Sequence, residues 1–335
     1  MIISRTPHRI SLFGGGTDFP EHFLDHEGAV LGFSIDRFIY HTLSTLSEGL
    51  FDYKLRLAYS TTETVIDVEE VRHGPFREII KQTAPELGYE IHVCSDLPAF
   101  SGLGSSSSFS VGLLNLFNEY CNMHRDKYAI AREAIRIERD VLLEKVGWQD
   151  QIFASHGGFN IIQFRRDATY EVIPLELTEQ KLEELVACSL LVHTGIRRRA
   201  QDIEKVKFQD MSAVKGKLLE IQNFVGKAEQ ILCGNNSIAE LGQLLNRLWN
   251  VKRSLSGAVS NDAIDSLYSA AIKAGAWGGK LLGAGGGGCL FFLVPPERRS
   301  EVIGSLNGVT PIEFTVNRTG AEIMFSTLGG AGANQ

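Results

Sequence analysis

Hydrophobic and polar positions change their period several times along the chain, and these changes predict both strands and helices. Residues 90–95 alternate between apolar and polar side chains, which is typical of a half-buried strand. Residues 109–122 instead carry apolar side chains at helical spacing, and the unbroken apolar run at residues 289–294 indicates a buried strand. Because these elements do not alternate regularly as strand, helix and strand, the pattern predicts an α+β fold with antiparallel sheet.

The same patterns predict further elements in two parts of the chain. In the first part, strands are expected at residues 1–12, 29–35, 38–43, 55–59, 64–66, 158–164 and 170–174, and helices at 19–26, 69–87 and 127–143. In the second part, strands are expected at 188–192 and 311–316, and helices at 200–232, 238–255, 262–274 and 297–306. A charged helix or linker at residues 176–186 separates the two parts, so we expect domains at residues 1–184 and 185–335.

Composition narrows the class of protein. The chain has 335 residues, 44% of them hydrophobic and 22% charged, which is ordinary for a globular protein with two cores. Its net charge of −7 argues against a general nucleic-acid binder, and no run reaches the ~18 apolar residues of a membrane span. Five scattered cysteines without a CxxC pair, and a start without an apolar leader, predict a cytoplasmic protein with reduced thiols.

One segment, residues 98–108, combines glycines and serines between the predicted strand at 90–95 and the helix that follows. Such a loop presents backbone N–H groups and hydroxyls at the positive end of a helix dipole, where anions bind. A nucleotide phosphate is the anion that we expect there. A serine-rich helix cap without a ligand is the alternative.

A second segment, residues 283–288, fits the spacing G-x-G-x-x-G, but a helix precedes it and a strand follows it. A dinucleotide-binding turn has the opposite order, and Leu281 stands where a Walker-type loop has Ser or Thr. Neither of those sites is therefore predicted. The run of glycines favours close approach of the backbone to a ligand, with a tight turn into a strand as the alternative.

A third segment, residues 7–19, joins a cation at Arg9, a glycine turn and the carboxylate of Asp18. Alone it fits either a ligand site or a charged surface cap. Together, the three segments resemble the three motifs of the GHMP kinases, the superfamily of galactokinase, homoserine kinase and mevalonate kinase, in the same order and across nearly the whole chain. The resemblance implies an N-terminal domain like ribosomal protein S5 domain 2 and a C-terminal ferredoxin-like domain. It also implies that ATP, Mg²⁺ and a substrate are bound between them.

Details of the motifs indicate a branch of this family. Residues 15–18 read Gly-Gly-Thr-Asp, whereas galactokinases have Glu and His at the first two of these positions. This string, together with residues 147–151 and 193–195, resembles the heptose 7-phosphate kinases best and the fucokinases next. The resemblance implies that ATP phosphorylates a small sugar phosphate, D-glycero-D-manno-heptose 7-phosphate, at its anomeric hydroxyl. An unphosphorylated sugar such as L-fucose, or a non-catalytic ligand sensor, is the alternative, and both a monomer and a homodimer stay open.

The resemblance also assigns roles to single residues. Asp150 matches the catalytic carboxylate that orients or deprotonates the sugar hydroxyl, and Arg9 matches the motif arginine that keeps this carboxylate ionised. Glu138, twelve residues before Asp150, matches the Mg²⁺-binding glutamate, and Ser106 matches its serine partner. The serines on either side of Ser106 are the alternatives.

The expected ligand contacts follow from the same motifs. The ATP-binding loop comprises Gly102, Leu103, Gly104, Ser105, Ser106, Ser107 and Ser108. The substrate contacts comprise Arg5, Gly14, Gly15, Gly16, Thr17, Asp18, His193, Arg197, Gly285 and Gly286. Arg197 is the first of three adjacent arginines that predict a phosphate clamp, because the guanidinium fork binds phosphate at two points. A surface cluster without a ligand is the alternative.

Overall fold

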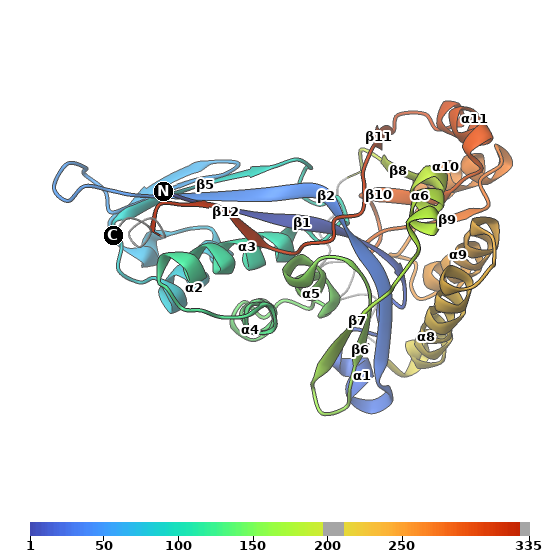
Figure 1. Ribbon diagram of the computed structural model, residues 1–335, viewed down its shortest axis with the longest axis horizontal. Helices are drawn as coiled ribbons and strands as arrows, with labels where there is room; N and C mark the ends of the chain where they lie inside the picture. The colour runs from blue at the N-terminus through green and yellow to red at the C-terminus, as the bar shows by residue number, and fades with distance from the viewer. Residues whose placement is uncertain (197–210, 329–335) are drawn as a thin grey trace.

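The computed structural model describes residues 1–196 and 211–328, which build two β-sheets with helices packed on them (Figure 1). The larger sheet consists of β1 (Ile2–Phe13), β2 (Gly28–Thr45), β3 (Leu55–Ala58), β4 (Thr62–Val65), β5 (Tyr89–Ser95), β6 (Phe159–Phe164), β7 (Tyr170–Pro174) and β12 (Glu322–Ser326). Its main strand order is β12-β1-β2-β5-β3-β4, and β6 pairs with both β2 and β7. Among the pairs in this sheet only β3 and β5 run parallel.

The smaller sheet is antiparallel and holds four strands in the order β11-β8-β10-β9. Its strands are β8 (Ser189–His193), β9 (Gly278–Leu281), β10 (Cys289–Leu293) and β11 (Thr310–Ile312). All five residues of β10 are buried, as the unbroken apolar run predicts. The described part of the chain is therefore an α+β structure with helices on both sheets.

Four helices cover one face of the larger sheet and lie below it in Figure 1: α2 (Gly74–Thr83), α3 (Ser105–Tyr120), α4 (Lys127–Arg136) and α5 (Gln149–His156). The central helix α3 packs on β1 and β2, and glycine at one position lets it approach them closely. A Cβ atom at Gly112 would lie only 2.6 Å from Thr6 Oγ1 and 2.7 Å from His41 Nδ1. This contact fixes α3 against the sheet, and so fixes the start of α3 beside β1.

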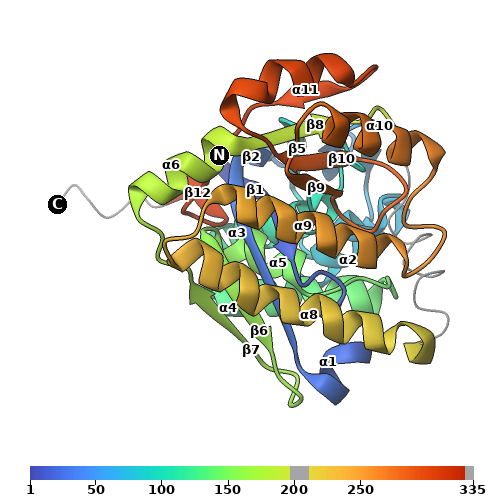
Figure 2. The ribbon, with the colours of Figure 1, turned by 90° about the vertical axis from the view of Figure 1, so that its right-hand side faces the viewer.

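Five more α-helices of the described chain lie between β7 and β12 in the sequence. They are α6 (Glu179–Cys188), α8 (Met211–Cys233), α9 (Ile238–Arg253), α10 (Asp262–Lys273) and α11 (Arg299–Ser305). Figure 2 shows α8 and α9 side by side, and α9 packs directly on β9. A capping box between Ser237 and Glu240 begins α9, and the fully buried Trp249 anchors it in the core.

Several elements differ from the prediction. The helix expected at 127–143 ends at Arg136 and continues as one π-helical turn, Ile137–Val141, which contains Glu138. The helix expected at 69–87 is shorter, because Gly74 and Pro75 form its first turn. Residues 278–281 form β9 where no strand is predicted, and β12 is also unpredicted. Residues 200–210 of the helix expected at 200–232 lie outside the described residues.

The division at residues 184 and 185 stays a prediction, and the sheets add one fact to it. After β11 the chain returns to the larger sheet, where β12 pairs with β1 from Ile2 to Arg5.

None of the helices in the described ranges combines the length and the apolar character needed to cross a membrane.

Candidate active site

Arg9 and Asp150 form a two-point ion pair between the larger sheet and its helices. Arg9 lies on β1 and Asp150 in the first turn of α5. The guanidinium donates from Nε to Oδ1 at 2.8 Å and from Nη2 to Oδ2 at 2.7 Å. Its third nitrogen, Nη1, donates to the carbonyl of Gly102 at 2.8 Å. The Arg9 side chain is 4% exposed and that of Asp150 is 27% exposed. The guanidinium is therefore buried in the protein, whereas the carboxylate reaches solvent.

The serine-rich loop before α3 lies directly against this pair. The N–H of Arg9 donates to the carbonyl of Leu103 at 3.1 Å. Gly104 adopts a φ of +79°, and a Cβ atom there would lie 3.3 Å from Arg9 Cγ and 3.5 Å from Asp150 Oδ2. Glycine at this position therefore lets the loop approach the ion pair with a backbone that L side chains rarely adopt.

The glycine segment at 283–288 joins β9 to β10 and packs on the serine-rich loop. The N–H of Cys289 donates to the carbonyl of Ser101 at 2.9 Å, and a Cβ atom at Gly283 would lie 2.9 Å from Gly102 Cα. Gly285 and Gly286 approach a different part of the chain, because the Gly286 N–H donates to the carbonyl of Val259 at 3.0 Å. All three glycine-rich segments singled out in the sequence thus meet around Arg9 and Asp150.

The four serines at the start of α3 face different surroundings. Ser105 lies 3.2 Å from the Ser101 hydroxyl, and Ser106 is exposed. The hydroxyl of Ser107 donates to Glu138 at 3.0 Å, and that of Ser108 donates to the carbonyl of Pro7 at 2.8 Å. The first two hydroxyls therefore lie at the surface of the loop, whereas the last two are buried.

Glu138 is a buried carboxylate with one unsatisfied oxygen. Its Oε2 accepts from Ser107 and, at 2.7 Å, from the Nε2 amide of Gln151. Among the described residues its Oε1 has no hydrogen-bond partner. Burial raises the pKa of Glu138 to about 7, because the charged form loses its hydration. Of the four serines at the start of α3, Ser107 is the one that donates to Glu138, and the assignment of Ser106 to the metal stays a prediction.

The oxygens of Glu138 and Ser107 are better suited to bind a divalent cation than to form hydrogen bonds within the protein alone. A buried carboxylate oxygen without a partner is costly unless a cation or a donor meets it. Mg²⁺ prefers hard oxygen ligands and commonly takes only one or two carboxylates beside substrate phosphates and water. No cluster of three or more His, Cys, Asp or Glu side chains able to hold a metal occurs in residues 1–196 and 211–328.

Asp18 is completely buried beside the start of α5. Its Oδ1 accepts from the Gly16 N–H at 2.8 Å, and its Oδ2 accepts from the Nε2 amide of Gln149 at 3.0 Å. Burial, and next the charge of Asp150, raise the pKa of the Asp18 carboxyl. A Cβ atom at Gly147 would lie 1.9 Å from Oδ2, so only glycine fits there.

The rest of the turn at residues 14–17 supports Asp18. The buried hydroxyl of Thr17 lies 2.8 Å from the carbonyl of Gly14 and 2.9 Å from that of Ala29, which closes the turn. A Cβ atom at Gly15 would lie 3.4 Å from Ser11 Oγ, and one at Gly16 would lie 3.1 Å from Leu218 of α8. Thr17 thus holds the loop, while Gly16 lies against the second part of the chain.

Of three further predicted substrate contacts, Arg5 lies away from Asp150, His193 pairs with Cys289 directly after the glycine segment, and Arg197 lies outside the described residues. Arg5 forms an ion pair with Glu322 of β12 and stacks over Phe38, so the structure does not bring it to Asp150. His193 ends β8, where its Nδ1 lies 3.2 Å from the Gly195 N–H. Arg197, and the two arginines after it, lie outside the described residues, and the phosphate clamp stays a prediction.

Three further residues of this site are not among the predicted ones. Gln149 and Gln151 flank Asp150, and each donates a side-chain amide to one of the buried carboxylates Asp18 and Glu138. The only sequence signal for these two glutamines is the string at residues 147–151, which resembles the heptose 7-phosphate kinases. Lys280, the first residue of the third motif, donates to backbone carbonyls of β1.

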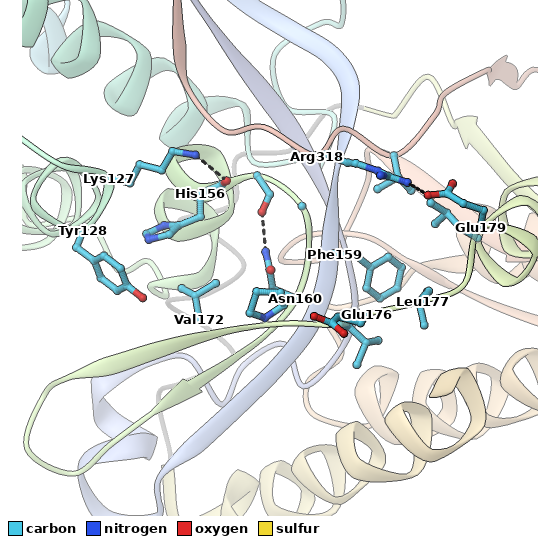
Figure 3. Close-up of a pocket in the computed structure, with 16 residues that line it drawn as sticks. Lys127, Tyr128, His156, Phe159, Asn160, Val172, Glu176, Leu177, Glu179 and Arg318 are labelled. Atoms are coloured by element: carbon cyan, nitrogen blue, oxygen red, sulfur yellow. Dashed lines mark hydrogen bonds and ion pairs between the residues drawn. The ribbon is translucent and has the colours of Figure 1, made fainter. Parts of the chain in front are cut away.

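A hollow of about 620 Å³ lies at the other end of α5 (Figure 3). Side chains from α4, β7 and α6 surround it, together with the loop that leads into β6. Figure 3 shows Lys127 and His156 on one side and Arg318 beside Glu179 on another. No residue that the sequence predicted for ATP, metal or substrate lines this hollow.

Comparison with known proteins agrees with the geometry. The model of the GHMP kinases N terminal domain matches residues 74–158, and the model of the GHMP kinases C terminal domain matches residues 229–309. A D-glycero-alpha-D-manno-heptose 7-phosphate kinase from Campylobacter jejuni is 33% identical over 322 residues, which cover 91% of this chain and 93% of that protein. An L-fucokinase/L-fucose-1-P guanylyltransferase from Bacteroides fragilis is 27% identical, with 96% of this chain and 38% of that protein covered.

A solved structure is also similar over the whole chain. It is a D-glycero-D-manno-heptose 1-phosphate kinase from Bacteroides thetaiotaomicron, with a TM-score of 0.79 and 24% identity, covering 97% of this chain and 99% of that one. At this identity the likeness concerns the fold. The arrangement of two sheets and their helices is therefore shared with a known kinase.

Proposed function

The chain belongs to the GHMP kinase family, and from this premise we propose that it transfers the γ-phosphoryl group of ATP to the anomeric hydroxyl of D-glycero-D-manno-heptose 7-phosphate. As a sugar kinase it is a phosphotransferase with an alcohol group as acceptor. The name of the 33% identical relative supports the choice of sugar. The observation that carries the proposal is the Arg9–Asp150 pair at the meeting point of the three glycine-rich segments.

The proposed reaction needs no reactant other than ATP and the sugar phosphate. The anomeric oxygen forms a bond to the γ-phosphorus, and the bond from that phosphorus to the bridging oxygen breaks. The hydroxyl proton passes to Asp150 and then to solvent. The products are the 1,7-bisphosphate and ADP.

Asp150 orients the attacking hydroxyl, and Arg9 fixes Asp150. Both guanidinium contacts hold the carboxylate plane, so its remaining lone pairs point in a defined direction. The buried guanidinium of Arg9 also places a positive charge beside the reacting phosphate. Positioning and charge compensation of this kind supply most of the catalysis in phosphoryl transfer.

The remaining groups divide between the two substrates. The backbone N–H groups at the start of α3 and the hydroxyls of Ser105 and Ser106 bind the ATP phosphates. Asp18, held by Gln149, accepts hydrogen bonds from the sugar. Glu138, with the hydroxyls of Ser106 and Ser107, would hold Mg²⁺, which when bound neutralises charge on the phosphates.

The proposal is tested by ³¹P NMR of the purified protein with Mg-ATP and one sugar at a time: heptose 7-phosphate, L-fucose, galactose or mevalonate as an unrelated acceptor. A new anomeric phosphate signal with heptose 7-phosphate, absent in Asp150→Asn, is the expected result. Turnover of L-fucose instead would keep the kinase and replace the sugar, which the match to the fucokinase makes the second candidate. Binding of ATP without turnover of any acceptor would contradict the proposed reaction.

A further inference from the structure

Lys280 crosses from the smaller sheet to the larger one inside the protein core. It lies on β9, and the residue is only 2% exposed. Its Nζ donates to the carbonyl of Ser11 at 2.8 Å and to that of Leu12 at 2.9 Å. Both carbonyls belong to β1, two and three residues after Arg9.

The two carbonyls lie at a break in the β1–β2 ladder. Ser11 is opposite Gly32 and Phe13 is opposite Leu31, so Leu12 is an extra residue in β1. Such a β-bulge disturbs the regular hydrogen bonding of the strand and bends it. An ammonium group with three donors is well suited to satisfy both carbonyls at this bend.

This position connects two of the segments that surround Asp150. After the bulge, β1 leads directly into the turn at residues 14–18 that holds Asp18. After Lys280, β9 leads directly into the glycine segment at 283–288, which packs on Gly102. A change in the Lys280 contact would therefore shift these two segments relative to one another.

We propose that Lys280 is a positioning residue for the reaction: it holds the sugar-binding turn at residues 14–18 in register with the glycine segment at residues 283–288. This proposal rests on the proposed function, because it names a support of the same site. Lys280 acts through the backbone of β1 and touches neither substrate.

The chain offers a matched control in a second buried lysine. Lys252 of α9 is 6% exposed, and its Nζ donates to the carbonyls of Leu281 at 3.2 Å and Gly283 at 2.7 Å. It also lies in the core and also meets two backbone carbonyls, but these contacts stay within the second part of the chain. Removal of either ammonium therefore leaves two buried carbonyls without this donor, whereas only removal of Lys280 loosens β1.

The test compares Lys280→Met and Lys252→Met, because methionine keeps the length of the side chain without leaving a buried charge. We expect kcat/KM for heptose 7-phosphate to fall about tenfold to a hundredfold in Lys280→Met, as for a small misplacement of a reactant. Lys252→Met loses a donor to Gly283 of the same glycine segment but none to β1, so it serves as the control for the state of β1 and not for turnover. Thermal unfolding of both variants measures how much stability each protein loses with its two hydrogen bonds.

A second readout does not depend on turnover. Amide hydrogen exchange of residues 11–18 is expected to become faster in Lys280→Met and to stay unchanged in Lys252→Met. Equal exchange of residues 11–18 in the two variants, or an unchanged kcat/KM in Lys280→Met, would overturn the proposal. If wild-type protein does not phosphorylate heptose 7-phosphate, the proposed function fails, and the exchange experiment still decides whether Lys280 holds this turn.

Discussion

The two ends of α5 differ in how their polar groups are used. At the first end, Asp150 is contacted by Arg9 from β1 and lies beside Gly104 of the loop before α3. Asp18 and Glu138 are buried next to residues that flank Asp150. Polar groups from several distant segments therefore converge at one end of a single short helix.

At the other end, several polar groups around the hollow have local partners, although the buried Nε2 of His156 has none among the described residues. Lys127 donates to the carbonyl of His156, the Asn160 amide donates to the carbonyl of Gly157, and Arg318 pairs with Glu179 on the surface. The hollow is large, but no buried charge faces a second one across it. The difference teaches that convergence of buried charged groups, more than the volume of a cavity, indicates where chemistry takes place.

The strongest test of this comparison is Asp150→Asn. The amide keeps the shape but cannot take a proton or pair with the guanidinium at two points. We expect kcat to fall about a thousandfold, the middle of the range for loss of a positioned acid or base. Steady-state kinetics and ATP binding measured on the same sample check this, and wild-type turnover by the variant would remove Asp150 from the reaction.

A second test uses the buried carboxylate of Glu138. Its folded pKa of about 7 lies above the ordinary 4.5, so the folded state holds the proton more tightly than the unfolded one. Its contribution to stability is complete below about pH 4.5 and is lost as pH rises through about 7, on the order of 3 kcal/mol in all.

Denaturant unfolding of the Mg²⁺-free wild type and of Glu138→Gln, at several pH values from about 5 to about 8, measures the pH-dependent contribution of Glu138 to the free energy of unfolding. We expect the wild type to lose stability relative to the variant as pH rises, because the variant cannot ionise there. Parallel curves for the two proteins would show that the carboxylate is already charged at low pH.

A third test separates the shape of Arg9 from its charge. Lysine keeps the positive charge but lacks the fork that meets both Asp150 oxygens and the Gly102 carbonyl. We expect Arg9→Lys to lower kcat about tenfold to a hundredfold through a misplaced carboxylate. Stopped-flow single turnovers show whether the chemical step is slowed, and an unchanged rate would mean that charge alone suffices.

The smallest effect is expected at the hollow. Arg318→Ala removes an exposed ion pair with Glu179, in which both side chains are about 70% exposed. Turnover is expected to stay within about twofold of wild type, as for most surface substitutions. A large loss of activity in this variant would show that the hollow takes part in the reaction, and the contrast between the two ends would not hold.

Much of this architecture follows from local sequence patterns. The strong periodicity at 109–122 and 289–294 correctly predicts α3 and β10, which the structure places at Ser105–Tyr120 and Cys289–Leu293. The family and structure matches confirm the predicted GHMP kinase fold. Strand β12 was not predicted, because its partner is β1 at the opposite end of the described chain. Strand β9 was missed since half of its four residues are glycine, which patterns rarely assign to strands.

The site shows a similar limit. Motif spacing brings out Arg9, Asp150 and Glu138, and the structure places all three close to the same helix. The choice between Ser106 and Ser107 depends on about 100° of helix rotation, which repetitive serines cannot specify. Which carbonyls Lys280 meets depends on a bulge in β1, and no local pattern reveals it.

The pairing of β12 with β1 has a consequence for synthesis on the ribosome. The strand that carries Arg9 is translated about three hundred residues before residues 322–326, which cover its outer edge. At about 5–20 residues per second, that edge waits on the order of tens of seconds for its partner. During this interval the nascent chain exposes an unpaired strand edge that can pair with another chain.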